Sequence, residues 1–318
     1  MEINLARRLS IRHNTLAMMK GSDVTGDLLK DVSRSFYLTI RFLPQEMRPA
    51  VALGYMLARA TDTVADNASA SPELRIHVLQ RMADAISGNM NEAEIQDVSR
   101  VLNLEVEHES EAILLQEFPR CLLALETFDE VQKAVIRKVL ATIIQGQLWD
   151  LTAFAQRDTV ESDEETKRYT YSVAGCVGEF WTELGYATMQ GRFCNPERSE
   201  VMVQAGIRYG QGLQLINILR DMQEDEARGR HYLCSDAHKW LNRAASYMND
   251  GIDYCLRLGT FRLRFASILP ALLGKKTIEL LRVSTLGTGK VKIKRRVVYG
   301  CLLRAIFLCL RRKQSLGI

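Results

Sequence analysis

Signals that begin helices recur along most of this 318-residue chain, whereas signals for β-hairpins are nearly absent. Apolar residues follow Pro49 at helical spacing, and Ser71-Pro72-Glu73 combines an N-cap residue, a first-turn proline and an acid. Residues 127–130 (TFDE) fit a capping box, and residues 195–197 (NPE) open a helix that we expect to reach residue 225. Asp250-Gly251 is the one candidate for a hairpin turn. The chain is therefore predicted to be all-α.

Charge is distributed unevenly along the chain. Residues 275–313 carry twelve Lys or Arg and one acid, a charge of +11, although the whole chain carries only +4. The other residues therefore hold −7. A basic end of this kind can bind phosphate in lipid headgroups, in a soluble ligand or in nucleic acid. No recognisable nucleic-acid-binding module accompanies it, so we expect no nucleic-acid partner.

Cysteine and histidine usage restricts the kinds of metal site. The seven cysteines form no CxxC pair and the five histidines form no HxxxH arrangement, which argues against disulfides and against a zinc site. Any bound metal would then be held by carboxylates, which points to Mg²⁺. The most apolar stretch, residues 297–310, is too short to cross a hydrocarbon layer of ~30 Å, so it is interpreted as an interfacial helix.

Two short acidic motifs end apolar helical stretches: residues 62–66 (DTVAD) and residues 217–225 (NILRDMQED). Spacing by four residues places the acids of each motif on one helix face. A lone DxxxD is usually a solvated acidic stripe, but here there are two, and each has an arginine close by, Arg59 and Arg220. Mg²⁺ would relieve the repulsion between the carboxylates, and the arginines would bind phosphate oxygens. The motifs therefore indicate a site for diphosphate ionisation.

Four segments in this order resemble the squalene/phytoene synthase family over roughly residues 30 to 235. They are residues 33–37 (SRSFY), 55–66 (YMLARATDTVAD), 169–178 (YTYSVAGCVG) and 214–225 (QLINILRDMQED). The resemblance implies an all-α class I isoprenoid synthase fold with a central cavity between two aspartate-bearing helices. It also implies Mg²⁺-dependent head-to-head condensation of two prenyl diphosphates, most simply farnesyl diphosphate.

Roles for individual residues follow from the resemblance. Mg²⁺, with Mn²⁺ as an alternative, would be bound by Asp62, Asp66, Asn217, Asp221 and Asp225. Substrate diphosphate would be bound by Ser33, Arg34, Tyr55, Arg59, Gln214, Arg220 and Arg230.

Two aromatic residues are expected to act in catalysis. Tyr169 would take or relay the proton lost in cyclopropane closure, and Phe36 would stabilise a cation. A structural hydrogen bond for Tyr169 and core packing for Phe36 are the alternatives. Gly175 and Gly178 are interpreted as positions of close helix approach or of room for an isoprenoid chain, not as a nucleotide loop.

Members of this family differ in whether NADPH reduces the cyclopropyl intermediate. Residues 290–296 (KVKIKRR) resemble the stretch that squalene-forming members use near the NADPH phosphates. By this resemblance Lys292 and Lys294 would bind the cofactor phosphates, together with Arg34 and Arg59 from the earlier motifs. The sequence DTVAD at residues 62–66 also favours the squalene-forming members, although Ala65 stands where their pattern has a carboxylate. We therefore expect squalene formation, with dehydrosqualene or phytoene formation as the alternative.

Other classes of protein fit the sequence less well. A chain-elongating prenyltransferase or terpene cyclase does not suit the SRSFY and YxxxVAG segments, and a non-catalytic assembly factor on the same fold would be expected to lose aspartates that are intact here. We expect one prenyl synthase domain over residues 1–290 and a C-terminal segment over residues 291–318 that contacts cofactor phosphate and a membrane surface. The predicted location is cytoplasmic and peripherally membrane-associated. The sequence leaves the oligomeric state open.

Overall fold

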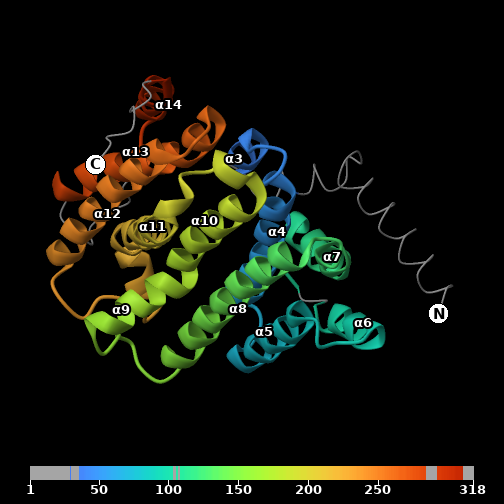
Figure 1. Cartoon of the computed structure of the whole chain (residues 1–318). Helices are drawn as coiled ribbons and strands as arrows, with labels where there is room; N and C mark the ends of the chain where they lie inside the picture. The colour runs from blue at the N-terminus through green and yellow to red at the C-terminus, as the bar shows by residue number, and fades with distance from the viewer. Residues whose placement is uncertain (1–28, 30–35, 103–104, 107, 284–291, 311–318) are drawn as a thin grey trace. The chain divides into compact units, whose positions relative to one another are not determined.

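The computed structural model describes residues 29, 36–102, 105–106, 108–283 and 292–310, and most of these residues lie in helices (Figure 1). The α-helices are α3 (Phe36–Phe42), α4 (Arg48–Asp66), α5 (Pro72–Ser87), α6 (Glu92–Val101), α7 (Glu109–Leu125), α8 (Glu130–Ala153), α9 (Asp163–Thr170), α10 (Cys176–Met189), α11 (Ser199–Ala227), α12 (Ala237–Arg257), α13 (Phe261–Val283) and α14 (Arg295–Leu310). Within the described ranges there is no strand, and a single β-bridge pairs Thr159 with His231. The prediction of an all-α fold is confirmed.

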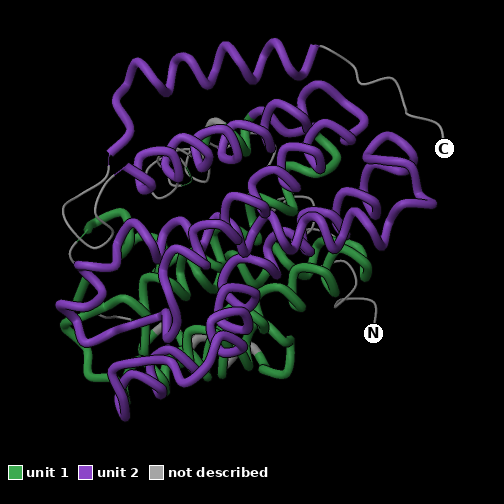
Figure 2. The backbone as a smooth tube through the Cα atoms, turned by 90° about the vertical axis from the view of Figure 1, so that its left-hand side faces the viewer, with its two compact units in different colours: residues 1–41, 45–148 green, residues 42–44, 149–318 purple. Residues whose placement is uncertain are grey.

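The chain divides into two compact units (Figure 2). Unit 1 comprises residues 1–41 and 45–148. Within it, α4 packs against α5 and α7, and α6 packs against α5 and α7. The apolar face of α4 is fully buried, with Leu57 and Val64 inaccessible to solvent, and Phe118 of α7 is equally buried. These contacts fix the helix that carries the first acidic motif.

Unit 2 comprises residues 42–44 and 149–318. Helix α11 contacts α9, α10, α12 and α13, so it forms the centre of this unit. Close contact between α11 and α10 depends on residues without side chains. A Cβ atom at Gly178 would lie 1.9 Å from the Gly206 carbonyl oxygen, and one at Gly210 would lie 2.1 Å from the Ala174 carbonyl oxygen. The interpretation of the small residues as positions of close helix approach is confirmed.

A π-helical turn, η1 (Tyr171–Gly175), joins α9 to α10. The backbone N–H of Cys176 reaches the carbonyl of Tyr171, five residues earlier, which is the hydrogen bond that defines a π-turn. Tyr171 also donates its hydroxyl to Glu179 at 2.7 Å. The turn therefore inserts one additional residue between Tyr169 and the helix packed on α11.

Most predicted helix starts agree with the structure, and two local predictions were wrong. Ser71 caps α5 by accepting from the Leu74 N–H, as expected. Asp129, not Thr127, caps α8, since its carboxylate accepts from the Gln132 N–H while the Thr127 hydroxyl donates back to the preceding helix. Asp250-Gly251 is not a hairpin turn but lies inside α12.

The C-terminal helix α14 packs on α13 through a stripe of small side chains, Cys301, Ala305 and Cys309. Large apolar side chains on its other faces are exposed, among them Tyr299 (64%) and Leu303 (70%). Among the helices of the described ranges, none combines the length and hydropathy needed to cross a membrane. The predicted boundary between residues 290 and 291 stays a prediction.

Candidate active site

In unit 1 the first acidic motif occupies the last turns of α4, and Arg59 and Asp62 each meet a partner from another helix. Arg59 donates to Glu111 of α7, with 2.5 Å between Nη2 and Oε1. Asp62 Oδ1 accepts from the Gln147 side-chain amide of α8 at 2.7 Å. Tyr55 lies one turn before Arg59, and Asp66 one turn after Asp62, so the structure brings these predicted residues onto one face.

The electrostatics of this face are those of a desolvated acid pair. Burial, and then the charge of Asp66, raise the pKa of Asp62 from 3.8 to about 6, although Arg59 and the Gln147 hydrogen bond act in the opposite direction. By accessible surface Asp62 is partly exposed as a residue. A cation placed here would remove the main electrostatic cost.

In unit 2 the second motif lies along the C-terminal half of α11. Asn217 donates to the Gln214 side chain at 3.4 Å, and Arg220 forms a bidentate pair with Asp221 through Nε at 2.8 Å and Nη2. Burial, and then Asp221, raise the pKa of Asp225 to about 6. The two motifs therefore share one electrostatic character, a pair of aspartates of which one is desolvated.

Arg230 lies on the segment that follows α11, and its guanidinium contacts Asp150 at 2.9 Å between Nη1 and Oδ2. The other oxygen of Asp150 accepts from the Tyr232 hydroxyl at 2.7 Å. Asp150 is 8% exposed and belongs to the last turns of α8. This carboxylate thus connects a predicted diphosphate-binding arginine to a tyrosine.

Three further aromatic rings form a cluster with that tyrosine. Tyr169 of α9 stacks on Tyr232 with ring centroids 4.8 Å apart, and Trp149 lies 5.5 Å from Tyr169. Phe154 meets Tyr232 edge-on at 5.0 Å. Burial is the first cause that raises the pKa of Tyr169, followed by the charge of Asp150. Such faces attract positive charge without offering a nucleophile.

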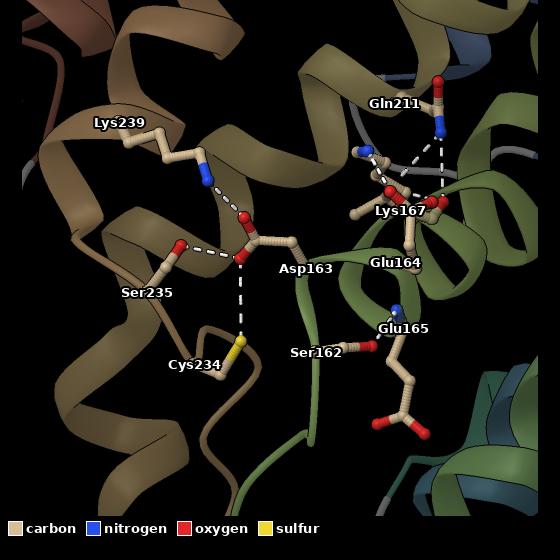
Figure 3. A network of polar contacts seen from close by, with 10 residues as sticks. Ser162, Asp163, Glu164, Glu165, Lys167, Gln211, Cys234, Ser235 and Lys239 are labelled. Carbon is tan, nitrogen blue, oxygen red and sulfur yellow. Dashed lines mark hydrogen bonds and ion pairs between the residues drawn. The ribbon is translucent and has the colours of Figure 1, made fainter.

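A separate polar network holds α9 against the segment that leads into α12 (Figure 3). Asp163, the first residue of α9, pairs with Lys239 and accepts from the Ser235 hydroxyl at 2.6 Å. These contacts, with Lys239 first, lower the pKa of Asp163 to about 2. Gln211 of α11 also donates to the Lys167 carbonyl at 3.0 Å. The network fixes the helix that carries Tyr169.

A small pocket opens beside Arg230 and Tyr232. Its walls come from the end of α11 and from the segment after it, and they include Met222, Asp225, Arg230 and Tyr232. Apolar and ionic side chains therefore meet at one opening.

The arrangement of carboxylates is compatible with Mg²⁺. Over the described ranges, no three His, Cys, Asp or Glu side chains gather closely enough to hold a metal ion on their own. Each motif instead offers two aspartates on one helix face, and Mg²⁺ commonly binds one or two carboxylates together with substrate phosphates.

Some predicted residues are not brought into this geometry. Ser33 and Arg34 lie outside the described residues, and Phe36 is placed only as the first residue of α3. Lys292 and Lys294 are exposed on the short segment before α14. Their predicted roles stay predictions.

Sequence reasoning missed four partners of the predicted residues, namely Glu111, Gln147, Asp150 and Tyr232. A signal existed for two of them. Gln147 and Asp150 are polar residues three positions apart in a mostly apolar helical stretch, which is unusual for a core-facing surface. Glu111 and Tyr232 carried no local signal.

The family model for squalene/phytoene synthase matches residues 29–240. A bifunctional lycopene cyclase/phytoene synthase of Pyrenophora tritici-repentis is 27% identical over 91% of this chain and 47% of its own length. Squalene synthase of Rattus norvegicus is 28% identical over 72% of this chain and 52% of its own length. The chain thus spans about half the length of these curated relatives.

Solved structures agree on the fold. A complex of TcSQS with the ligand E5700 has a TM-score of 0.69 at 23% identity, and covers 90% of this chain and 87% of that one. A dehydrosqualene synthase has a TM-score of 0.57 at 18% identity, and covers 94% and 97%. The family model spans both acidic motifs and the tyrosine pair, so this chain belongs to the squalene/phytoene synthase family of head-to-head prenyl diphosphate condensing enzymes.

Proposed function

We propose that the protein condenses two farnesyl diphosphates to presqualene diphosphate and then reduces this product to squalene with NADPH. The observation that carries the first step is the pair of desolvated aspartates, Asp62 and Asp225, each beside a second aspartate and an arginine. Paired carboxylates in that state are suited to divalent cations that bind diphosphate.

The residues present fit Mg²⁺, with Mn²⁺ as an alternative. We assign Asp62 and Asp66 as ligands in one motif, and Asp221 and Asp225 with Asn217 in the other. Bound Mg²⁺ would neutralise the charge that develops on the departing diphosphate. Binding of diphosphate would be completed by Ser33, Arg34, Tyr55, Arg59, Gln214, Arg220 and Arg230.

Arg59 and Arg220 already contact carboxylates, Glu111 and Asp221 respectively. Their ion pairs orient the guanidinium groups before substrate arrives, and the remaining N–H donors stay available for phosphate oxygens. Each arginine therefore acts as a preorganised diphosphate ligand in the proposal.

The aromatic group supports the step that follows ionisation. Trp149, Tyr169 and Tyr232 present ring faces and edges within one cluster, which would stabilise an allylic cation and exclude water from it. Phe36 is assigned the same role from its motif. Tyr169 is assigned as the acceptor of the proton that is lost when the cyclopropane closes.

The reduction step is assigned to exposed cations of the C-terminal segment. Lys292 and Lys294 would bind NADPH phosphates, together with Arg34 and Arg59. The solvent-facing ammonium groups fit such a ligand. The second candidate is phytoene or dehydrosqualene synthesis without hydride transfer, which the match to bifunctional lycopene cyclase/phytoene synthases over 91% of the chain favours.

Extraction of products made from farnesyl or geranylgeranyl diphosphate, with and without NADPH, tests the proposal. Squalene formed only with NADPH is the expected result. Identical products under both conditions would support the second candidate. A purified protein that releases no diphosphate from either substrate, even with Mg²⁺, would favour the non-catalytic assembly factor.

The double variant Lys292→Gln with Lys294→Gln refines that test. It should spare cyclopropane formation but accumulate presqualene diphosphate, because each lost charge-assisted contact weakens cofactor binding by about 1.5–3 kcal/mol. Raising NADPH should partly restore squalene. Normal squalene output at low NADPH would exclude these lysines from the cofactor site.

We also propose a cytoplasmic protein that associates peripherally with membranes through α14. Leu303, Phe307 and Leu310 are exposed on this helix (70%, 53% and 69%), and Arg295 and Arg296 begin it. Apolar side chains beside arginines suit the headgroup boundary of an anionic bilayer, into which a hydrocarbon product would also pass.

A further inference from the structure

A chain of polar contacts leads from Tyr169 to a buried carboxylate. Tyr169 stacks on Tyr232 with ring centroids 4.8 Å apart, and an interaction between the two side chains is among the causes that raise the pKa of Tyr169. Tyr232 in turn donates to Asp150 Oδ1 at 2.7 Å. The path from Tyr169 through Tyr232 therefore ends at Asp150.

Asp150 is held so that it can accept a proton without moving. Its second oxygen contacts Arg230 at 2.9 Å, which anchors the carboxylate in place, and only 8% of the residue is exposed. The Thr166 hydroxyl donates to the Tyr232 carbonyl at 2.8 Å and fixes the backbone of the central residue. The relative positions of the three groups are thus set by contacts on each of them.

The surroundings favour transfer along the chain over exchange with water. Trp149 and Phe154 cover the tyrosine pair with apolar rings, and Tyr169 and Tyr232 stack at an interplanar angle of 15°. The Asp163 network holds α9, and hence Tyr169, from its other end (Figure 3). A preorganised path in a water-poor site can move protons without reorganisation of solvent.

A neutral tyrosine is a weak base when it acts alone. Accepting a proton on its hydroxyl would leave a positively charged oxygen unless its own proton departs at the same time. The Tyr232–Asp150 pair supplies that exit, since the carboxylate is a far better acceptor than a phenol.

We propose that Asp150 is the terminal proton acceptor of a relay that runs from Tyr169 through Tyr232. This inference rests on the proposed condensation. When the cyclopropane closes, a C–H bond at C1 of the first, ionised prenyl unit breaks, and its electron pair forms the ring bond to the cationic C3 of the second prenyl diphosphate. The proton passes to the Tyr169 oxygen, the Tyr169 proton to Tyr232, and the Tyr232 proton to Asp150 Oδ1. The carboxylic acid returns its proton to the diphosphate product or to solvent.

Tyr232 and Asp150 are therefore positioning residues that act through Tyr169. The test uses the full-length variants Asp150→Asn and Tyr232→Phe with farnesyl diphosphate and Mg²⁺ in single turnovers. Diphosphate release and the ratio of cyclopropyl product to prenyl alcohols are measured separately. Ionisation should change by less than about threefold, while the ratio falls by about 100-fold, the usual contribution of general base catalysis.

A second readout separates chemistry from structure. With substrate deuterated at C1, the deuterium effect on the product ratio should be larger in both variants than in the wild type, because proton removal then limits the partition. Tyr209→Phe is the matched control, since Tyr209 is also buried and donates to the Ser267 carbonyl at 2.7 Å. It should leave both readouts unchanged. Tm values identify any variant that fails to fold. If Asp150→Asn fails to fold, Tyr232→Phe still tests the relay.

Two results would overturn the relay. One is a product ratio in Asp150→Asn and Tyr232→Phe equal to that of Tyr209→Phe, which would make the leaving diphosphate the base. The other is a loss of ionisation in parallel with cyclopropane formation, which would indicate a structural role only. Absence of diphosphate release by the wild type would instead refute the proposed function, and the relay with it.

Discussion

Replacing Asp62 by Asn should make the protein more stable and inactive at the same time. The folded protein raises the pKa of this carboxyl from 3.8 to about 6, mainly through burial and then through Asp66. Without metal, an ionised Asp62 therefore destabilises the native state at neutral pH. Asparagine keeps an oxygen that can accept from Gln147 and removes the charge.

The magnitude follows from linkage. Because one pKa unit is worth about 1.4 kcal/mol, the rise sets an upper limit of about 3 kcal/mol at pH 8. Asp62 is only partly buried, so solvent screening reduces the value, and we expect a gain of about 1–2 kcal/mol in the free energy of unfolding.

The direction of the pKa shift of Asp62 determines how the stability difference between the two proteins changes with pH. Since the folded state holds the proton more tightly, the stability that the protonated group contributes is present below the unfolded pKa of 3.8 and is lost as pH rises to about 6. The advantage of Asp62→Asn should therefore appear above pH 6 and vanish near pH 4. Urea unfolding at both pH values, in EDTA, measures it.

The exposed residue Asp84 of α5 provides the control, since Asp84→Asn should show no such difference. Mg²⁺ with inorganic diphosphate should raise the Tm of the wild type more than that of Asp62→Asn, and diphosphate release from substrate should be lost in Asp62→Asn alone. Equal or lower stability of Asp62→Asn at pH 8 would refute the reasoning, and full turnover would exclude Asp62 as a metal ligand.

Three further changes test other parts of the structure. Gly178→Ala should cost about 3 kcal/mol or more of stability in thermal unfolding, since the new Cβ meets backbone at 1.9 Å, whereas Gly191→Ala, with nothing within 4 Å, should cost little. Leu303→Glu with Phe307→Glu should abolish binding to anionic vesicles and leave Tm unchanged; persistent, salt-resistant binding would contradict this. Asp163→Asn should lower Tm at pH 7, and the deficit should shrink as pH falls towards 2, where wild-type Asp163 is itself protonated.

Local spacing explains which parts of the fold could be predicted from sequence. The α4 and α5 starts and the faces of both acidic motifs depend on residues within a turn or two of each other, so periodicity and capping chemistry were sufficient. Capping of α8 was mispredicted because Thr127 and Asp129 are both good caps, and the contact of Thr127 with the preceding helix decided between them.

The parts of the site that escaped prediction depend on contacts distant in sequence. Tyr232 and Asp150 are 82 residues apart, and Arg59 and Glu111 are 52 apart. No rule of local spacing connects such pairs, since tertiary contacts such as the packing of α7 on α4 bring them together. Motif resemblance identified Arg230 but not the carboxylate that orients it.

The π-turn at residues 171–175 has a consequence for how this family can change by insertion and deletion. Removing one residue from the turn would restore ordinary α-helical hydrogen bonding. Because a π-turn accommodates its additional residue as a local bulge, the helices on either side of it would keep their phase. Tyr169 would then retain its stack with Tyr232, and the glycine contacts that follow the turn would stay intact. The change would fall on the turn itself, where Tyr171 would lose its present position beside Glu179. A single-codon deletion here should thus yield a folded protein that keeps its tyrosine pair, so homologues can differ by one residue in the length of this segment.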